Sequence, residues 1–454
     1  MLKEITTLLP RPCRALLCAS LVALLPIAAS AQTAPEPERE TLLNGLRILY
    51  WPQLGNPNVL LRLRIHSGAA FDFADKGGMM ALLSDALFPD PSTREYVNEE
   101  LGGRLEVTTT YDAIDVTISG KATALERMID LLRGAVLTTQ LGADNVATLK
   151  TARLKLLSDK PSTAAVAADQ AIAARLFGAF PYGHPASGTA ATVAKVERAD
   201  LLLARERFLN SDNASVAVVG GVEKPRLMRA LRQLLGPWGK SDRMIPATFR
   251  QPAAPNGRVF VVDTPVATSS EIRLAIRGLS RGDSDALIAD LLAMIARDRW
   301  QAAVPELSNA SVRHEDHLLP GIFLFSANVP QGSAAKAAAA AQDVMRKLSQ
   351  AAPTADEVER ARLALVTQLS QQFSQPAGLA EAWLDVDTFK SSRPSTVSTL
   401  IRSLTPADLQ RVAVRLFKDA PVATVVVGNY EQLKPLFGGN LDAYGDPAVP
   451  AKKP

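Results

Sequence analysis

The sequence predicts an α+β fold made of two tandem homologous repeats, each a mostly antiparallel sheet with helices packed on one face. The first observation is internal similarity. Residues 197–221 and 405–429 align without gaps, and both contain Ala-Asp-Leu, a helical segment, a turn, a valine-rich strand and Gly. Residues 44–69 and 256–282 likewise share Asn-Gly, a strand, a loop and an alternating strand. Self-similarity at both ends of each half indicates a duplicated domain.

The order of elements within each repeat supports the same fold class. We expect strand, strand, helix, strand pair, long helices, and then a final helix and strand. Residues 104–120 alternate and are rich in Thr and Val, which favours a strand pair. Residues 334–350 and 355–373 contain many strong helix formers. Helices that cover one face of an antiparallel sheet are typical of α+β domains.

The N-terminal residues have the pattern of a secretory signal peptide. Lys3, Arg11 and Arg14 precede a short apolar run that ends in small residues, which predicts cleavage after Ala31. A membrane anchor is the alternative, but the apolar run is short for a bilayer span. We therefore expect a periplasmic or secreted product with no membrane anchor after cleavage.

The domain boundaries follow from these patterns and from the turn-rich segment between the repeats. We predict a signal peptide at 1–31, a flexible leader at 32–40, an N-terminal domain at 41–238, a linker at 239–255, a C-terminal domain at 256–440 and a tail at 441–454.

Cysteine content and charge exclude several classes of function. Cys13 and Cys18 are the only cysteines in the 454 residues, and both lie in the predicted signal peptide. The mature chain therefore has no disulfide, thiolate metal site or cysteine nucleophile. The formal net charge is only +4, and no basic stripe is interleaved with aromatic residues, so nucleic-acid binding has no support.

The stretch from Gly77 to Phe88 predicts a helix with one face in the core. Apolar residues recur at helical spacing on that face, namely Met79, Leu82, Leu83, Ala86 and Leu87. The opposite face carries Ala81, Ser84, Asp85 and Phe88.

Several stretches together resemble a known family. They are "NGLR" with its strand, "RIHSGAAFDFADKGG", the helix that ends in Leu-Phe, "FGAFPYGHPASGT" and "FLNSDNASVAVVGG". In this combination the chain is similar to the M16 peptidases, which include pitrilysin, the insulinases and the mitochondrial processing peptidase. The resemblance covers nearly all of the mature chain and implies the M16/LuxS-like metallohydrolase fold.

The resemblance also implies where a zinc site would lie. In active members the helix carries the motif H-x-x-E-H, whose two imidazoles bind zinc while the Glu polarises the bound water. Here the motif positions fall on Ala81, Ser84 and Asp85, and the position of the distal Glu ligand falls at Arg153. A guanidinium cannot ligate zinc. We expect no catalytic residue, metal or cofactor in this chain, and zinc only in an active partner.

A second set of family residues comes from the C-terminal repeat. Active members or their inactive partners use an Arg and a Tyr there to hold the substrate carbonyl. The matching stretch is "WQAAVPELSNASV", which places Ala303 and Ala310 at those two positions.

The remaining candidates favour structural roles. His314 and His317 flank two acids and could hold a metal, but the stretch reads as strand or turn, so we expect a solvated polar edge. His66 alternates with leucines on a strand, which favours a structural histidine, and His184 lies in a loop of turn residues that it would shape. Four tryptophans are expected to be packing anchors: Trp51, Trp238, Trp300 and Trp383.

The last candidate functional feature is a surface that binds peptides. Family members add substrate to a sheet edge beside the metal helix, and the resemblance places that edge here at Leu105, Glu106, Val107 and Thr108. The alternative is that this stretch is only a strand of the sheet. The leading hypothesis is a non-catalytic M16-type subunit in the periplasm that pairs with an active zinc-bearing homologue as a hetero-oligomer and encloses unfolded peptides. One alternative is a zinc peptidase that acts alone through a relocated site. Another is a stand-alone peptide-binding or scaffold protein.

Overall fold

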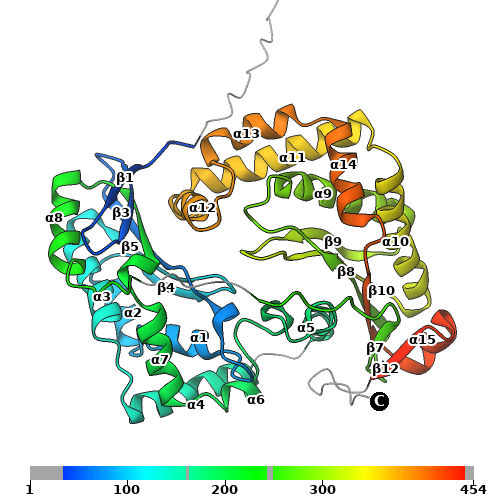
Figure 1. The fold of residues 1–454 in the computed structure, drawn as a ribbon, viewed down its shortest axis with the longest axis horizontal. Coiled ribbons are helices and arrows are strands. Elements are labelled where there is room, and N and C mark those ends of the chain that lie inside the picture. Colours follow the sequence, from blue (N-terminus) through cyan, green and yellow to red (C-terminus); the bar gives the residue numbers. More distant parts are fainter. Residues whose placement is uncertain (1–33, 160–162, 243–248, 445–454) are drawn as a thin grey trace, which may run out of the picture. The chain divides into compact units, whose positions relative to one another are not determined.

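Alternating hydrophobic segments form two six-stranded sheets, one in each half of the chain (Figure 1). The computed structural model describes residues 34–159, 163–242 and 249–444, and the predicted signal peptide lies outside them. The first sheet has the order β1 (Glu38–Thr41), β2 (Arg47–Pro52), β6 (Ala214–Gly220), β3 (Asn58–Ile65), β5 (Ile114–Lys121) and β4 (Arg104–Thr109). The second has the order β12 (Leu441–Tyr444), β7 (Val259–Asp263), β11 (Ala423–Gly428), β8 (Ser269–Arg277), β10 (Ile322–Pro330) and β9 (Ser308–Glu315).

The strand order confirms the predicted duplication. Five strands of one sheet correspond in order to five of the other, with β2, β3, β4, β5 and β6 matched by β7, β8, β9, β10 and β11. In both sheets the third-placed strand pairs parallel with the second and antiparallel with the fourth. The edge strands β4 and β9 are each joined to their neighbour as an antiparallel pair.

Helices follow the strands in a similar order in each half. The first half contains α1 (Met79–Asp85), α2 (Ser92–Glu99), α3 (Leu125–Leu137), α4 (Ala143–Asp159), α5 (Ala164–Phe177), α6 (Ala190–Val193), α7 (Arg198–Phe208) and α8 (Lys224–Leu235). The second half contains α9 (Ala286–Ala303), α10 (Ala334–Gln350), α11 (Ala355–Ser374), α12 (Pro376–Phe389), α13 (Pro394–Ser403), α14 (Pro406–Phe417) and α15 (Tyr430–Phe437). None of the helices described is long and apolar enough to cross a membrane.

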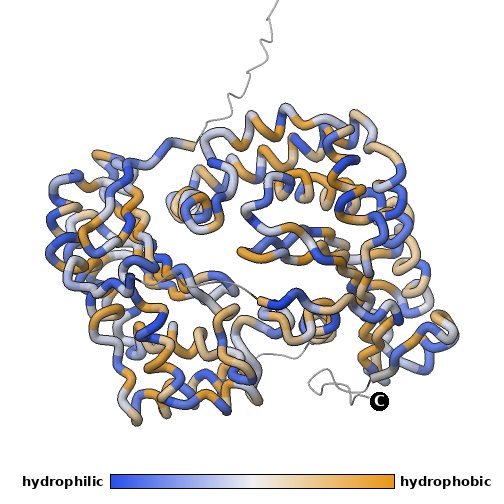
Figure 2. The backbone as a smooth tube through the Cα atoms, in the orientation of Figure 1, coloured by the Kyte–Doolittle hydropathy of each residue, from blue (hydrophilic) through white to orange (hydrophobic). Residues whose placement is uncertain are grey.

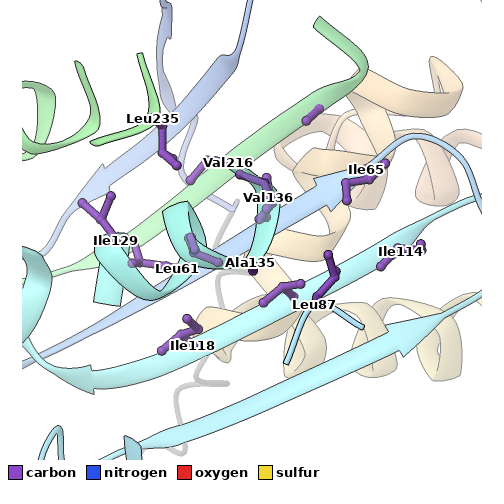
Figure 3. Close-up of a cluster of buried hydrophobic side chains, with 14 of the residues drawn as sticks. Leu61, Ile65, Leu87, Ile114, Ile118, Ile129, Ala135, Val136, Val216 and Leu235 are labelled. Carbon is purple, nitrogen blue, oxygen red and sulfur yellow. The ribbon is translucent and has the colours of Figure 1, made fainter. Parts of the chain in front are cut away.

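Each half has its own hydrophobic core between its sheet and its helices. In the first half, Leu61 and Ile65 of β3, Ile118 of β5 and Val216 of β6 belong to one buried cluster with Ile129 of α3 (Figure 3). The second core is built in the same way from β8 and β10 against α9, α10 and α14. Hydrophobic residues run along these strands, and hydrophilic residues occur on the helices around them (Figure 2).

The other face of each sheet is covered by a helix from the opposite half. Ala168, Ala171 and Ile172 of α5 pack on alternate residues of β7, β8, β10 and β11. Reciprocally, Trp383 and Leu384 of α12 pack on β2, β3 and β6. The predicted helices on one face are therefore present, and this exchange adds a helix to the second face. Because each half completes the other, the two repeats form one folding unit.

The folded part of the chain extends beyond both predicted domain boundaries. The composition of residues 32–40 predicts a flexible leader, but Glu38–Thr41 form β1 because they pair antiparallel with β2. The predicted tail, 441–454, begins with β12, which pairs parallel with β7. The expectation for the tryptophans is confirmed, since all four are at most 3% exposed: Trp51, Trp238, Trp300 and Trp383.

Candidate functional site

The helix α1 is held at its N-terminus by a carboxylate that the sequence analysis did not single out. Asp72 accepts hydrogen bonds from the backbone N–H groups of Gly78, at 2.6 Å, and Met80, at 2.7 Å. These are the unpaired donors at the start of a helix. Gly78 adopts a φ of 88°, and a Cβ there would lie 2.7 Å from the carbonyl oxygen of Ser187, so glycine is required. Burial raises the pKa of Asp72 to about 7.

The α1 helix is buried on both sides. It packs against α7 and also against α4 and β4. Ala81, Ser84 and Phe88, on the face opposite the predicted core face, are each no more than 6% exposed. That face is covered by neighbouring elements, and Asp85 is its half-buried member.

Arg153 of α4 joins two of the motif positions on α1. Its Nε donates to Asp85 Oδ2 at 2.8 Å and its Nη2 to Asp85 Oδ1 at 2.7 Å. The same Nη2 also donates to the carbonyl oxygen of Ala81 at 2.9 Å. The guanidinium therefore lies where α1 and α4 meet, and its charge is balanced by Asp85. Burial raises the pKa of Asp85, and the adjacent guanidinium opposes this rise.

Ser84 links the helix to the edge strand of the first sheet. Its Oγ donates to the carbonyl oxygen of Ala81 at 2.7 Å and accepts from Thr109 Oγ1 of β4 at 2.8 Å. The structure thus brings together Ala81, Ser84, Asp85 and Arg153, which lie up to 72 residues apart in the chain.

The donor set at this place does not fit zinc. It offers a methyl group, a hydroxyl that is already hydrogen-bonded, and a single carboxylate paired with a guanidinium. A catalytic zinc takes three protein ligands of the imidazole, carboxylate or thiolate type. Over the described ranges no group of three or more His, Cys, Asp or Glu side chains is placed to hold a metal.

The two positions predicted in the second repeat lie on different elements and differ in burial. Ala303 is the exposed last residue of α9, and Ala310 is a half-buried residue on β9 that packs against the second core. Neither side chain can donate or accept a hydrogen bond.

The expectation of a solvated polar edge at His314 and His317 is wrong. The His314 side chain is fully buried; its Nε2 accepts from the backbone N–H of Leu279 at 3.0 Å, and its Nδ1 lies 3.3 Å from Asp290 Oδ1. The His317 side chain is 19% exposed, and its Nδ1 lies 3.4 Å from Asp112 Oδ2. Strand alternation near the end of β9 directs the two imidazoles to different partners, so they form no shared site.

The other two histidines have structural surroundings, as expected. His66 Nε2 lies 2.8 Å from Arg47 Nη2 and 3.0 Å from Ser215 Oγ, while its Nδ1 lies 3.0 Å from Thr388 Oγ1. Burial and the nearby arginines lower the pKa of His66 to about 3. His184 receives a hydrogen bond at its backbone carbonyl from the Tyr111 hydroxyl.

The edge strand β4 offers main-chain groups for pairing. Thr110 N donates to the carbonyl oxygen of Ala113, and hydrogen-bonded positions alternate along an antiparallel pair. The main-chain groups of Glu106 and Thr108 are therefore the ones that face β5. The main-chain groups of Leu105 and Val107 point away from β5, and because β4 is an edge strand, no strand of the described sheet lies on that side. Of the four residues predicted to bind peptide, these two can therefore present their backbone to another strand.

Comparison with known proteins finds similarity to M16 peptidases. The family model described as the peptidase M16 inactive domain matches residues 195–365. A protein of Mycobacterium bovis that is named a zinc protease is 27% identical over 272 residues, which are 56% of this chain and 59% of that protein. The chain therefore spans less than two thirds of that relative.

Solved structures share the fold. The peptidase M16 inactive domain from Pseudomonas fluorescens superimposes with a TM-score of 0.76 at 17% identity, over 87% of this chain and 98% of that one. The periplasmic protease PqqL from Escherichia coli gives a TM-score of 0.70 at 17% identity, over 92% of this chain and 52% of that one. The family model, the relative and the common fold agree: the chain is similar to the M16 peptidases, and the match to the family model extends over residues 195–365.

Proposed function

We propose that this chain is a non-catalytic M16-type subunit that pairs with an active, zinc-bearing homologue and holds unfolded peptides on its β4 edge. The observation that carries the proposal is the contact of Arg153 with both Asp85 and Ala81. A fixed positive charge stands at the place where the family's zinc would bind, and it would repel a divalent cation.

Peptide binding is independent of those zinc ligands. Strand addition uses main-chain hydrogen bonds, and Leu105 and Val107 have main-chain N–H and C=O groups on the open side of β4. The proposed site is in the periplasm, which agrees with the predicted signal peptide and with the location stated for the PqqL neighbour.

The peptide site can be tested with one residue. Val107→Pro removes an N–H that faces away from β5, so the β4–β5 ladder stays intact while a bound strand loses a donor. Fluorescence anisotropy of a labelled, denatured peptide should show weaker binding to this variant. Val107→Ala, which keeps the N–H, is the matched control and should bind nearly as well as the parent. Equal binding by all three proteins would exclude β4 as the peptide site.

The non-catalytic role needs a separate test. The purified mature chain should contain no stoichiometric zinc and should not cleave a denatured peptide. Co-expression with a homologue that carries H-x-x-E-H should give a complex in size-exclusion chromatography that cleaves the peptide in a chelator-sensitive way. Chelator-sensitive cleavage by the chain alone would overturn the proposal. Failure to associate with any such homologue would favour a stand-alone peptide-binding protein.

A further inference from the structure

A cavity of about 250 Å³ lies in the second repeat, among α9, α11, α12 and α13. Apolar side chains line it, including Leu287 of α9 and Leu369 and Phe373 of α11. Carboxylates line it as well, including Asp290 of α9 and Asp385 of α12. This volume is just below the usual range for ligand pockets, so the cavity suits a small group rather than a drug-sized molecule.

His314, the imidazole beside Asp290, is neutral because its other ring nitrogen accepts a hydrogen bond. Leu279 N donates to His314 Nε2, and a nitrogen that accepts a hydrogen bond carries no proton. The single ring proton is therefore on Nδ1, which donates to Asp290 Oδ1. His314 supplies Asp290 with a hydrogen bond but with no compensating charge.

Asp290 is embedded in the protein and yet open to the cavity. Protein surrounds the carboxylate, and this burial raises its pKa. About 31% of the side chain is nevertheless accessible to water, because that part faces the cavity it lines. Over the described residues, Oδ2 of Asp290 has no hydrogen-bond partner.

Among the described residues that line the cavity, the cation is Arg281, and its guanidinium is paired with carboxylates other than Asp290. Arg281 Nε donates to Asp316 Oδ1 at 2.9 Å, and its Nη1 donates to Asp385 Oδ2 at 3.1 Å. Asp283, which also lines the cavity, is paired with Arg415. Asp290 is thus the acid of this wall that lacks a cationic partner within the described chain.

We propose that this cavity binds a primary ammonium group on a short alkyl chain, with the ammonium at Asp290 Oδ2 and the alkyl chain against Leu287 and Phe373. An ammonium has three donors and a compact charge, which suits a buried carboxylate with a free oxygen. A free alkylamine and the side chain of a lysine share this chemistry. The site lies in the second repeat, away from the α1 motif positions and β4, and the proposal does not depend on the proposed function.

Isothermal titration of the mature chain with n-butylamine at pH 7.5 tests the site, with butan-1-ol and butyrate at equal ionic strength as ligand controls. We expect butylamine alone to bind. Asp290→Asn keeps the acceptor for His314 but removes the charge, and it should weaken butylamine binding by about tenfold or more. Asp298→Asn is the matched control on the same helix, because Asp298 is exposed and paired with Arg297, and it should bind like the parent.

A second variant tests the cavity without changing the carboxylates, in case Asp290→Asn does not fold. Leu369→Trp fills the cavity from a half-buried position and leaves the carboxylates in place, so it should abolish butylamine binding while far-UV circular dichroism stays unchanged. Binding of butylamine by all variants alike, or equal binding of butan-1-ol, would overturn the proposal.

A titration with N-acetyl-lysine amide distinguishes the two sources of the ammonium group. Binding of both ligands supports a lysine side chain of a polypeptide as the occupant. Binding of butylamine alone supports a free alkylamine. Binding of neither contradicts the proposed site.

Discussion

Arg153 and Asp85 form a two-pronged ion pair, with Nε–Oδ2 at 2.8 Å and Nη2–Oδ1 at 2.7 Å, between helices whose paired residues lie 68 positions apart in the chain. The pair lies at two of the positions that the resemblance to M16 peptidases assigns to zinc ligands. Its side chains are 10% and 35% exposed, so the charges are only partly screened by water.

Removing the guanidinium should destabilise the protein. Arg153→Ala leaves Asp85 without its guanidinium partner and removes one of the donors to the Ala81 carbonyl. We expect the free energy of unfolding to fall by about 2 kcal/mol, a value reduced from that of a fully buried pair because Asp85 is partly exposed. Urea denaturation followed by circular dichroism measures it. Lys155→Ala on the same helix removes only an exposed pair with Asp159 and should change stability little. Equal stability of both variants would show that the Arg153 pair contributes nothing measurable.

The motif positions can be tested by restoring ligands. We expect a chain with Ala81→His, Ser84→Glu, Asp85→His and Arg153→Glu to bind about one zinc ion, since Arg153 of α4 already contacts Asp85 and the backbone of Ala81 on α1. Elemental analysis after dialysis gives the metal content. The same chain with Arg153 retained should bind much less zinc, because a fixed cation remains at the site. If the four substitutions leave a folded protein without zinc, the assignment of motif positions is wrong.

Asp72 should make stability depend on pH. Its pKa is near 3.8 when exposed and about 7 in the folded chain. Between these values the unfolded chain gives up the proton while the folded chain keeps it. The free energy of unfolding should therefore fall as pH rises from about 4 to about 7, by at most ~1.4 kcal/mol per pH unit.

The matched variant for this effect is Asp72→Asn. It cannot titrate, so the difference in unfolding free energy between pH 5 and pH 8 should be smaller than in the parent, although one helix N–H loses its acceptor. Urea denaturation at the two pH values provides the comparison. An unchanged pH dependence would assign the titration to another group.

The exchanged helix α12 should anchor the first sheet. Trp383 is fully buried, and its Nε1 has no hydrogen-bond partner among the described residues. Trp383→Ala should therefore destabilise the chain by about 4 kcal/mol through the cavity it leaves. Trp383→Phe keeps most of the packing and should destabilise it much less. Thermal unfolding gives both values, and Leu363→Ala, at an exposed position on α11, serves as the surface control. A small effect of Trp383→Ala would argue against a joint folding unit.

Much of the fold was predictable because its signals are local. The Thr- and Val-rich alternation of residues 104–120 appears as β4 and β5, and the helix formers after Ser333 appear as α10 and α11. The duplicated segments that end in Gly220 and Gly428 occupy equivalent strands of the two sheets. The boundaries of the leader and tail were not predictable, because β1 and β12 owe their form to partners far along the chain.

The sequence by itself determined that Ala81, Ser84 and Asp85 bring no imidazole to the helix, since the identity of a side chain sets which donors it can offer. It also determined the two-repeat α+β fold, through periodicity and self-similarity. Only the tertiary structure decided that Arg153 contacts Asp85, that α5 and α12 are exchanged between the sheets, and that His314 and His317 face different acids. Such contacts join residues distant in sequence, and they depend on how whole elements pack rather than on any local pattern.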